Sequence, residues 1–82
     1  MNWYWLSFAD PDKPKGAQFL GVSMVLASSF EDAICKAHEL GINPGGEVMC
    51  AELDYAPDEK LQHRLLSAED IKGISEKVHE TH

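Results

Sequence analysis

The sequence predicts a small α+β domain: a three-stranded sheet in β-β-α-β order, one packing helix, and one or two C-terminal helices. Three observations lead to this fold class. Three stretches of the chain show the two-residue alternation of strands. One segment carries apolar residues at three- and four-residue steps, as helices do. At 82 residues the chain has room for a single domain, expected over residues 1–82.

The first strand is expected at Met1–Ala9, which is aromatic and β-prone. Its alternation places Trp3 and Trp5 on one face and Tyr4 and Phe8 on the other. One aromatic set belongs in the core. The other is expected to contact C-terminal helices, a partner or a stacked ligand ring.

The second strand is expected at Gln18–Ala27, antiparallel to the first. The loop Asp10–Gly16 joins the two as a long hairpin connection. One face of the second strand carries alternating large apolar residues: Leu20, Val22, Met24 and Leu26.

A helix is expected from Phe30 to about Leu40. Two capping boxes fit its start, one with Ser at position 28 and Glu at 31, the other one residue later. Gly41 and Ile42 fit a Schellman stop. The apolar stripe of the helix consists of Phe30, Ala33, Ile34, Ala37 and Leu40.

The third strand is expected at Glu47–Tyr55, and a crossover through the helix makes it parallel to the second strand. Residues 1–55 then form the core of the domain. Residues 56–79 are expected to be helical, with a short helix over 58–66 and a last helix opened by a Ser67–Asp70 capping box. Residues 80–82 are expected to fray. The uncovered sheet face needs these helices or a second copy of the chain.

The net charge of −7 excludes non-specific nucleic-acid binding, which needs surplus cations. No apolar run is long enough to span a membrane, and the N-terminal residues lack the basic region of a signal peptide. Two cysteines are too few for a disulfide framework. A cytoplasmic location is therefore expected.

Two loops carry candidate contact residues. In the first loop these are Asp12, Lys13 and Lys15, although the pattern of a calcium loop is incomplete. In the loop Gly41–Glu47, the glycines provide backbone N–H groups for an anion nest. This second loop follows the negative end of a helix and matches no phosphate-binding motif, so a helix stop explains it better. Its candidate residues are Asn43, Gly45 and Gly46.

The sequence indicates a metal site or a catalytic site only weakly. Cys35 and His38 share part of a helix surface, and Cys50 or His63 would be needed to complete a metal set. Glu52 and Asp54 share a strand face as a carboxylate pair, which solvated strand ends often carry. We therefore expect no metal, no cofactor and no catalytic residues.

Three segments carry a resemblance: residues 5–10 (WLSFAD), residues 14–21 with PKG and FLG, and residues 40–48 (LGINPGGEV). They resemble a type of small protein from bacterial and phage genomes to which no activity is assigned. This resemblance implies no functional residues. The size, acidity and layout are also similar to those of phage proteins that block host defence complexes, a likeness of architecture and charge.

The first hypothesis is a small acidic, non-enzymatic interaction protein that binds and modulates a protein partner, for example as a phage-type inhibitor that mimics nucleic-acid charge. A homodimer through the first strand or the open sheet face is part of this hypothesis. The alternative is a small-ligand or nucleotide-binding protein with a pocket from loops 10–16 and 41–47. A minimal enzyme is the third hypothesis. Charge mimicry requires the helix-terminal carboxylates to gather on one face.

Overall fold

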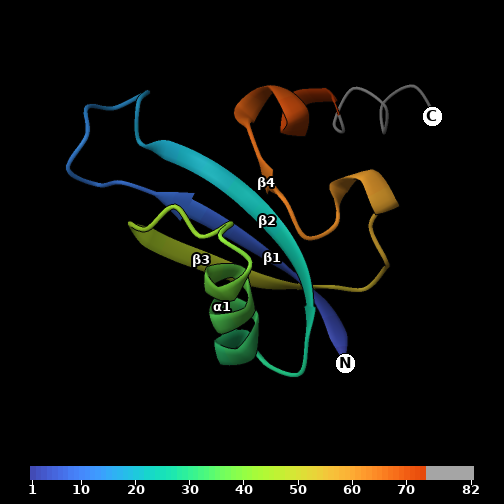
Figure 1. Cartoon of the computed structure of the whole chain (residues 1–82). Coiled ribbons are helices and arrows are strands. Elements are labelled where there is room, and N and C mark those ends of the chain that lie inside the picture. The colour runs from blue at the N-terminus through green and yellow to red at the C-terminus, as the bar shows by residue number, and fades with distance from the viewer. Residues whose placement is uncertain (74–82) are drawn as a thin grey trace.

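The fold is a four-stranded antiparallel sheet with α1 packed on one face, seen in a computed structural model that describes residues 1–73 (Figure 1). The order of strands across the sheet is β3-β1-β2-β4. The predicted α+β class and β-β-α-β order are confirmed, and β4 is an additional strand. The elements are β1 (Asn2–Ala9), β2 (Phe19–Ala27), α1 (Phe30–Glu39), β3 (Glu47–Leu53), the 3-10 helix η1 (Glu59–Leu61) and β4 (Leu65–Leu66).

The central strand is β1, which pairs antiparallel with β2 on one side and with β3 on the other. The strands β2 and β3 are therefore parallel to each other, as the crossover predicts, with β1 between them. Because both sides of β1 are already paired, its backbone cannot add a second copy of the chain. A second copy could therefore contact β1 through its side chains and not by strand addition, and the expected homodimer stays a prediction.

The alternation of β1 divides the core between the two sheet faces. On the α1 side, the β1 side chains Tyr4, Leu6 and Phe8 pack with residues of β2 and α1. On the opposite side, Trp5 packs against a second cluster built on Val22. The predicted division of the aromatic residues between faces is confirmed.

The C-terminal segment covers the β2 side of the second face. Leu66 in β4 is fully buried, and Leu61 and Ile71 pack beside it against Val22 and Met24. Residues after position 56 therefore close the second core over β2, as the open face required. Figure 1 shows α1 and the C-terminal segment on opposite sides of the sheet.

The start of α1 uses the second of the two predicted capping registers. Ser29 is the N-cap and its hydroxyl accepts a hydrogen bond from the Asp32 N–H, while the Asp32 carboxylate accepts bonds from Ser28. At the other end Gly41 N–H donates to the His38 carbonyl and Ile42 N–H to that of Ala37. This is the predicted Schellman stop.

Two sequence-based predictions fail in detail. The pairing of β1 with β2 shifts register between Phe8 and Ala9, so Leu20 packs on the α1 side rather than with Val22. The helix predicted over residues 58–66 is absent. The chain there forms η1, turns at His63 with a φ of 55°, and pairs as β4. Burial of Leu66 by pairing with Val22 outweighs the local helical pattern.

The last predicted helix begins as expected. Ser67 N–H donates to the Asp70 carboxylate at 2.9 Å, and Asp70 N–H donates to the Ser67 hydroxyl at 3.2 Å. Helical structure follows over residues 68–73. Its predicted continuation to residue 79 and the frayed tail at 80–82 lie outside the described residues. Within residues 1–73, no helix is long and apolar enough to cross a membrane.

Candidate binding surface

The candidate surface is built on β3, an open edge strand. The strand has seven residues, runs without a register shift and, within residues 1–73, pairs only with β1. In the described part of the chain, no further backbone hydrogen bond reaches its outer side. Protein edges are commonly protected by lysine, proline or a bulge, and β3 has none of these. Its outer N–H and C=O groups thus have no backbone partner among residues 1–73 and face an added strand as donors and acceptors.

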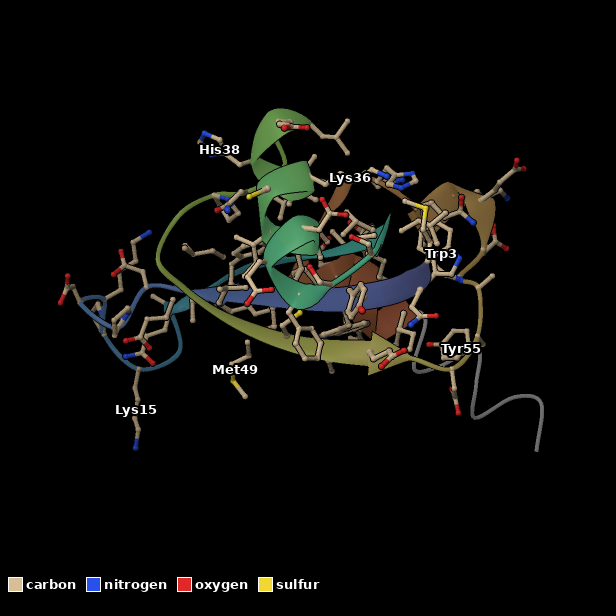
Figure 2. All side chains as sticks on the ribbon, turned by 90° about the horizontal axis from the view of Figure 1, so that it is seen from below. Trp3, Lys15, Lys36, His38, Met49 and Tyr55 are labelled. Carbon is tan, nitrogen blue, oxygen red and sulfur yellow. The ribbon has the colours of Figure 1, made fainter. Side chains whose placement is uncertain are left out.

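The two sides of β3 differ in character. On the side away from α1, Met49 is 77% exposed and Ala51 is exposed beside it. On the α1 side, Glu52 follows the partly buried Cys50. Figure 2 shows Met49 pointing away from α1. The side away from α1 therefore begins with Glu47 and continues with the exposed apolar residues Met49 and Ala51, and the α1 side ends in the carboxylate of Glu52.

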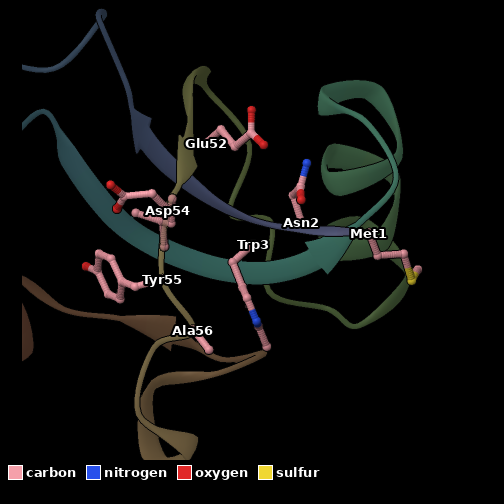
Figure 3. A pocket seen from close by; sticks show the side chains of 8 residues that line it. Met1, Asn2, Trp3, Glu52, Asp54, Tyr55 and Ala56 are labelled. Carbon is pink, nitrogen blue, oxygen red and sulfur yellow. The ribbon is translucent and has the colours of Figure 1, made fainter.

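A shallow hollow of about 330 Å³ adjoins the end of β3 and is open to solvent. Figure 3 shows the side chains of Trp3, Tyr55, Glu52 and Asp54 around it. Tyr55 is 57% exposed. The hollow is lined by Met1, Asn2, Trp3, Glu52, Leu53, Asp54, Tyr55 and Ala56. It thus combines two aromatic rings with two carboxylates.

The indole of Trp3 lies beside the ring of His63, with the two ring centroids 5.3 Å apart. The Nε2 atom of His63 accepts a hydrogen bond from the Leu26 N–H, and the His63 N–H donates to the Met24 carbonyl. Burial, and secondarily the charge of Lys36, lowers the pKa of His63 below its ordinary value. His63 is therefore neutral at pH 7, and the carboxylates determine the charge of the hollow.

The predicted loop residues lie at the other end of the sheet. Gly46 contacts Ala9, the last residue of β1, and the loop with Lys15 begins directly after β1. Trp3 lies six positions earlier on β1, or about 20 Å away at the rise of a strand. Figure 2 shows Lys15 and Trp3 at opposite ends of the molecule. The two loops therefore do not share a pocket with Trp3. The length of the first strand alone indicates this separation.

Local hydrogen bonds involve several of the candidate residues in the two loops. The Asp12 N–H donates to the Asp10 carboxylate, and the Gln18 side chain donates to the Lys13 carbonyl. In the second loop, Asn43 accepts a hydrogen bond from the Gly45 N–H at 2.9 Å, forming an Asx turn. Lys13 and Lys15 are exposed.

Trp5, the remaining predicted contact residue, packs against the second core cluster and is only partly exposed. The sequence did not single out Met49 and Tyr55 as candidate contact residues, and the structure exposes both. Among the described residues, those after position 56 pack against β2 rather than β3, which no local pattern indicates.

The helix-terminal carboxylates do not gather on one face. Glu31, Asp32 and Glu39 lie on or beside α1, whereas Asp58 and Glu69 belong to the segment on the opposite side of the sheet. This division removes the geometric condition for charge mimicry over one surface.

The possible metal-ligating residues are also separated. Cys35 and Cys50 are free cysteines, and burial raises the pKa of the Cys50 thiol. Cys35 and His38 are both exposed on α1. Among residues 1–73, no three His, Cys, Asp or Glu side chains lie close enough together to hold a metal ion.

Comparison of the chain with protein-family models, with curated proteins and with solved structures gives no match.

Proposed function

We propose that this chain is a non-enzymatic interaction protein that binds a protein partner through β3 and the surface beside it. The observation that carries the proposal is the unprotected edge of β3 together with the 77% exposure of Met49. An open edge recruits a strand through main-chain hydrogen bonds, and exposed methionine adapts to varied partner surfaces.

The aromatic residues near this edge support the same proposal. Tyr55 and Trp3 flank the hollow at the end of β3. Tyrosine and tryptophan are enriched among the residues that dominate protein interfaces, because they bury much area and lose little conformational entropy. The hollow and the edge are continuous through Leu53, so one partner can contact both.

Site-specific photo-crosslinking in cells of the source organism tests the proposal. A photoreactive phenylalanine replaces Met49 in one variant and Glu39, exposed on α1, in the control. We expect a discrete crosslinked protein from position 49 and not from position 39. Equal products from both positions, no product from position 49, or a crosslink only between two copies of the chain would contradict it.

A further inference from the structure

We infer that the partner presents an extended segment that pairs with β3, with apolar side chains on the face of Met49 and Ala51 and a lysine or arginine side chain on the face of Glu52, beside Asp54. This inference rests on the proposed function and adds the chemistry of the partner. It is carried by the backbone of β3, by the different character of its two sides, and by the composition of the hollow.

The backbone requirement is an extended segment. The outer side of β3 makes no backbone hydrogen bond within the described residues, and its regular pairing with β1 keeps the strand extended over Glu47–Leu53. A strand that is added to such an edge has its residues directly opposite those of β3 on each face.

The side-chain requirement follows from the face pattern. Residues opposite Met49 and Ala51 meet an exposed apolar surface, whereas a residue opposite Glu52 meets a carboxylate. Neighbouring residues of an added strand point to opposite faces, so the complementary segment has apolar side chains on the face of Met49 and Ala51 and a basic side chain opposite Glu52 on the other face.

The hollow explains why the basic residue is expected at this end of β3. Its carboxylates, Glu52 and Asp54, have no ion-pair partner among the described residues, where the one ion pair joins Arg64 and Asp70. Trp3 and Tyr55 also line this hollow. A long cationic side chain on a strand paired with β3 can place its charge beside these carboxylates, since opposite charges on facing strand residues attract.

A second copy of the chain fits this edge less well. Two copies that meet along β3 bring two sets of carboxylates to one sheet, from Glu47, Glu52 and Asp54. Each copy also carries a net charge of −7. Like charges brought together across strands are destabilising, whereas a basic segment is attracted.

The probe for the test is a short fluorescent peptide of alternating lysine and valine. The matched control has the same composition with the lysines gathered at one end. Fluorescence anisotropy measures the affinity, and amide chemical shifts of the labelled protein map the binding surface. We expect the alternating peptide to bind more tightly and the largest shifts in residues 47–55 and Trp3.

Charge variants test the role of the hollow. The double variant Glu52→Gln, Asp54→Asn should bind the alternating peptide about two- to tenfold more weakly, as expected for two exposed charge pairs. The matched control Glu31→Gln, Glu39→Gln removes the same charge from the α1 side and should change the affinity less. Chemical shifts of the free variants show that the fold is kept.

Four results would overturn the inference: equal binding of the two peptides, shifts centred on α1 or the loop at 10–18, an equal loss in the control variant, or concentration-dependent shifts of β3 in the protein alone. The last result would assign the edge to a second copy. If the peptide result is negative while position 49 still crosslinks a partner in cells, the proposed function stands and the basic segment is wrong.

Discussion

The contact of Gly46 with β1 leads to a specific stability prediction. Gly46 has a φ of 74°, and a Cβ atom at this position would meet the carbonyl oxygen of Ala9, with a methyl carbon of Leu20 at 3.1 Å. The Ala9 carbonyl belongs to the backbone of a strand paired on both sides, so it cannot rotate away. Gly46→Ala therefore combines an unfavourable backbone conformation with a steric clash.

The neighbouring glycine separates these two effects. Gly45 has a φ of 89° and open space around its would-be Cβ atom. We expect Gly45→Ala to cost about 1–2 kcal/mol for the left-handed conformation alone. Gly46→Ala adds about 1–3 kcal/mol for overpacking, for a total of about 2–5 kcal/mol. That is a large part of the roughly 4–12 kcal/mol expected for a chain of this length.

Thermal and urea unfolding, followed by circular dichroism and tryptophan fluorescence, measure the difference. Each 1 kcal/mol lowers the midpoint by about 4–8 °C in a domain of this size. Equal destabilisation by Gly45→Ala and Gly46→Ala would refute the argument that the Ala9 contact makes Gly46 necessary. The larger loss for Gly46→Ala would assign this residue a structural role, in place of the ligand contact that the sequence suggests.

Two further predictions concern the second core and the helix caps. Leu66→Ala should lower the free energy of unfolding in urea by about 2–5 kcal/mol, because Leu66 is 0% exposed. The control Leu65→Ala, at a residue that is 37% exposed, should lower it less. Equal losses of stability would mean that β4 does not close the second core. Hydrogen bonds from the backbone N–H and then the hydroxyl of a preceding serine lower the pKa of both Asp32 and Asp70. Their contribution to stability is therefore complete above the ordinary value of 3.8 and is lost as pH falls through the lower folded values. The double variant Asp32→Asn, Asp70→Asn should therefore show a smaller fall in the free energy of unfolding than the native chain when the pH is lowered from neutral to about pH 2. Urea unfolding at a series of pH values measures this fall, and the same fall in both proteins would contradict the prediction.

The elements defined by local chemistry were predictable from the sequence. Ser29 with Asp32, and Ser67 with Asp70, make the hydrogen bonds that their spacing indicates. Gly41 ends α1 as predicted. In these places the residue type satisfies an unpaired backbone group within a few positions along the chain, so the sequence contains the whole interaction.

The elements defined by distant contacts were not predictable in the same way. The strand β4 has only two residues, too few to show the alternation of a strand. The four-residue spacing of Leu61 and Leu65 is that of a helix. The bulge that turns Leu20 toward α1 interrupts an alternation that the sequence shows as continuous. The exposure of Met49 follows from where the C-terminal segment packs, which is a property of the whole fold.

The acidity of the chain has two separate physical origins. Asp32 and Asp70 accept capping hydrogen bonds at helix starts. Glu47, Glu52 and Asp54 instead lie along an edge strand or its end, where no bulge or lysine prevents strand addition. In the binding proposed above, these carboxylates have two effects. They repel the same edge of a second copy of the chain, and they attract a basic segment of a partner. Salt screens both interactions, so the preference of this edge for a basic strand over a second copy narrows as the ionic strength rises.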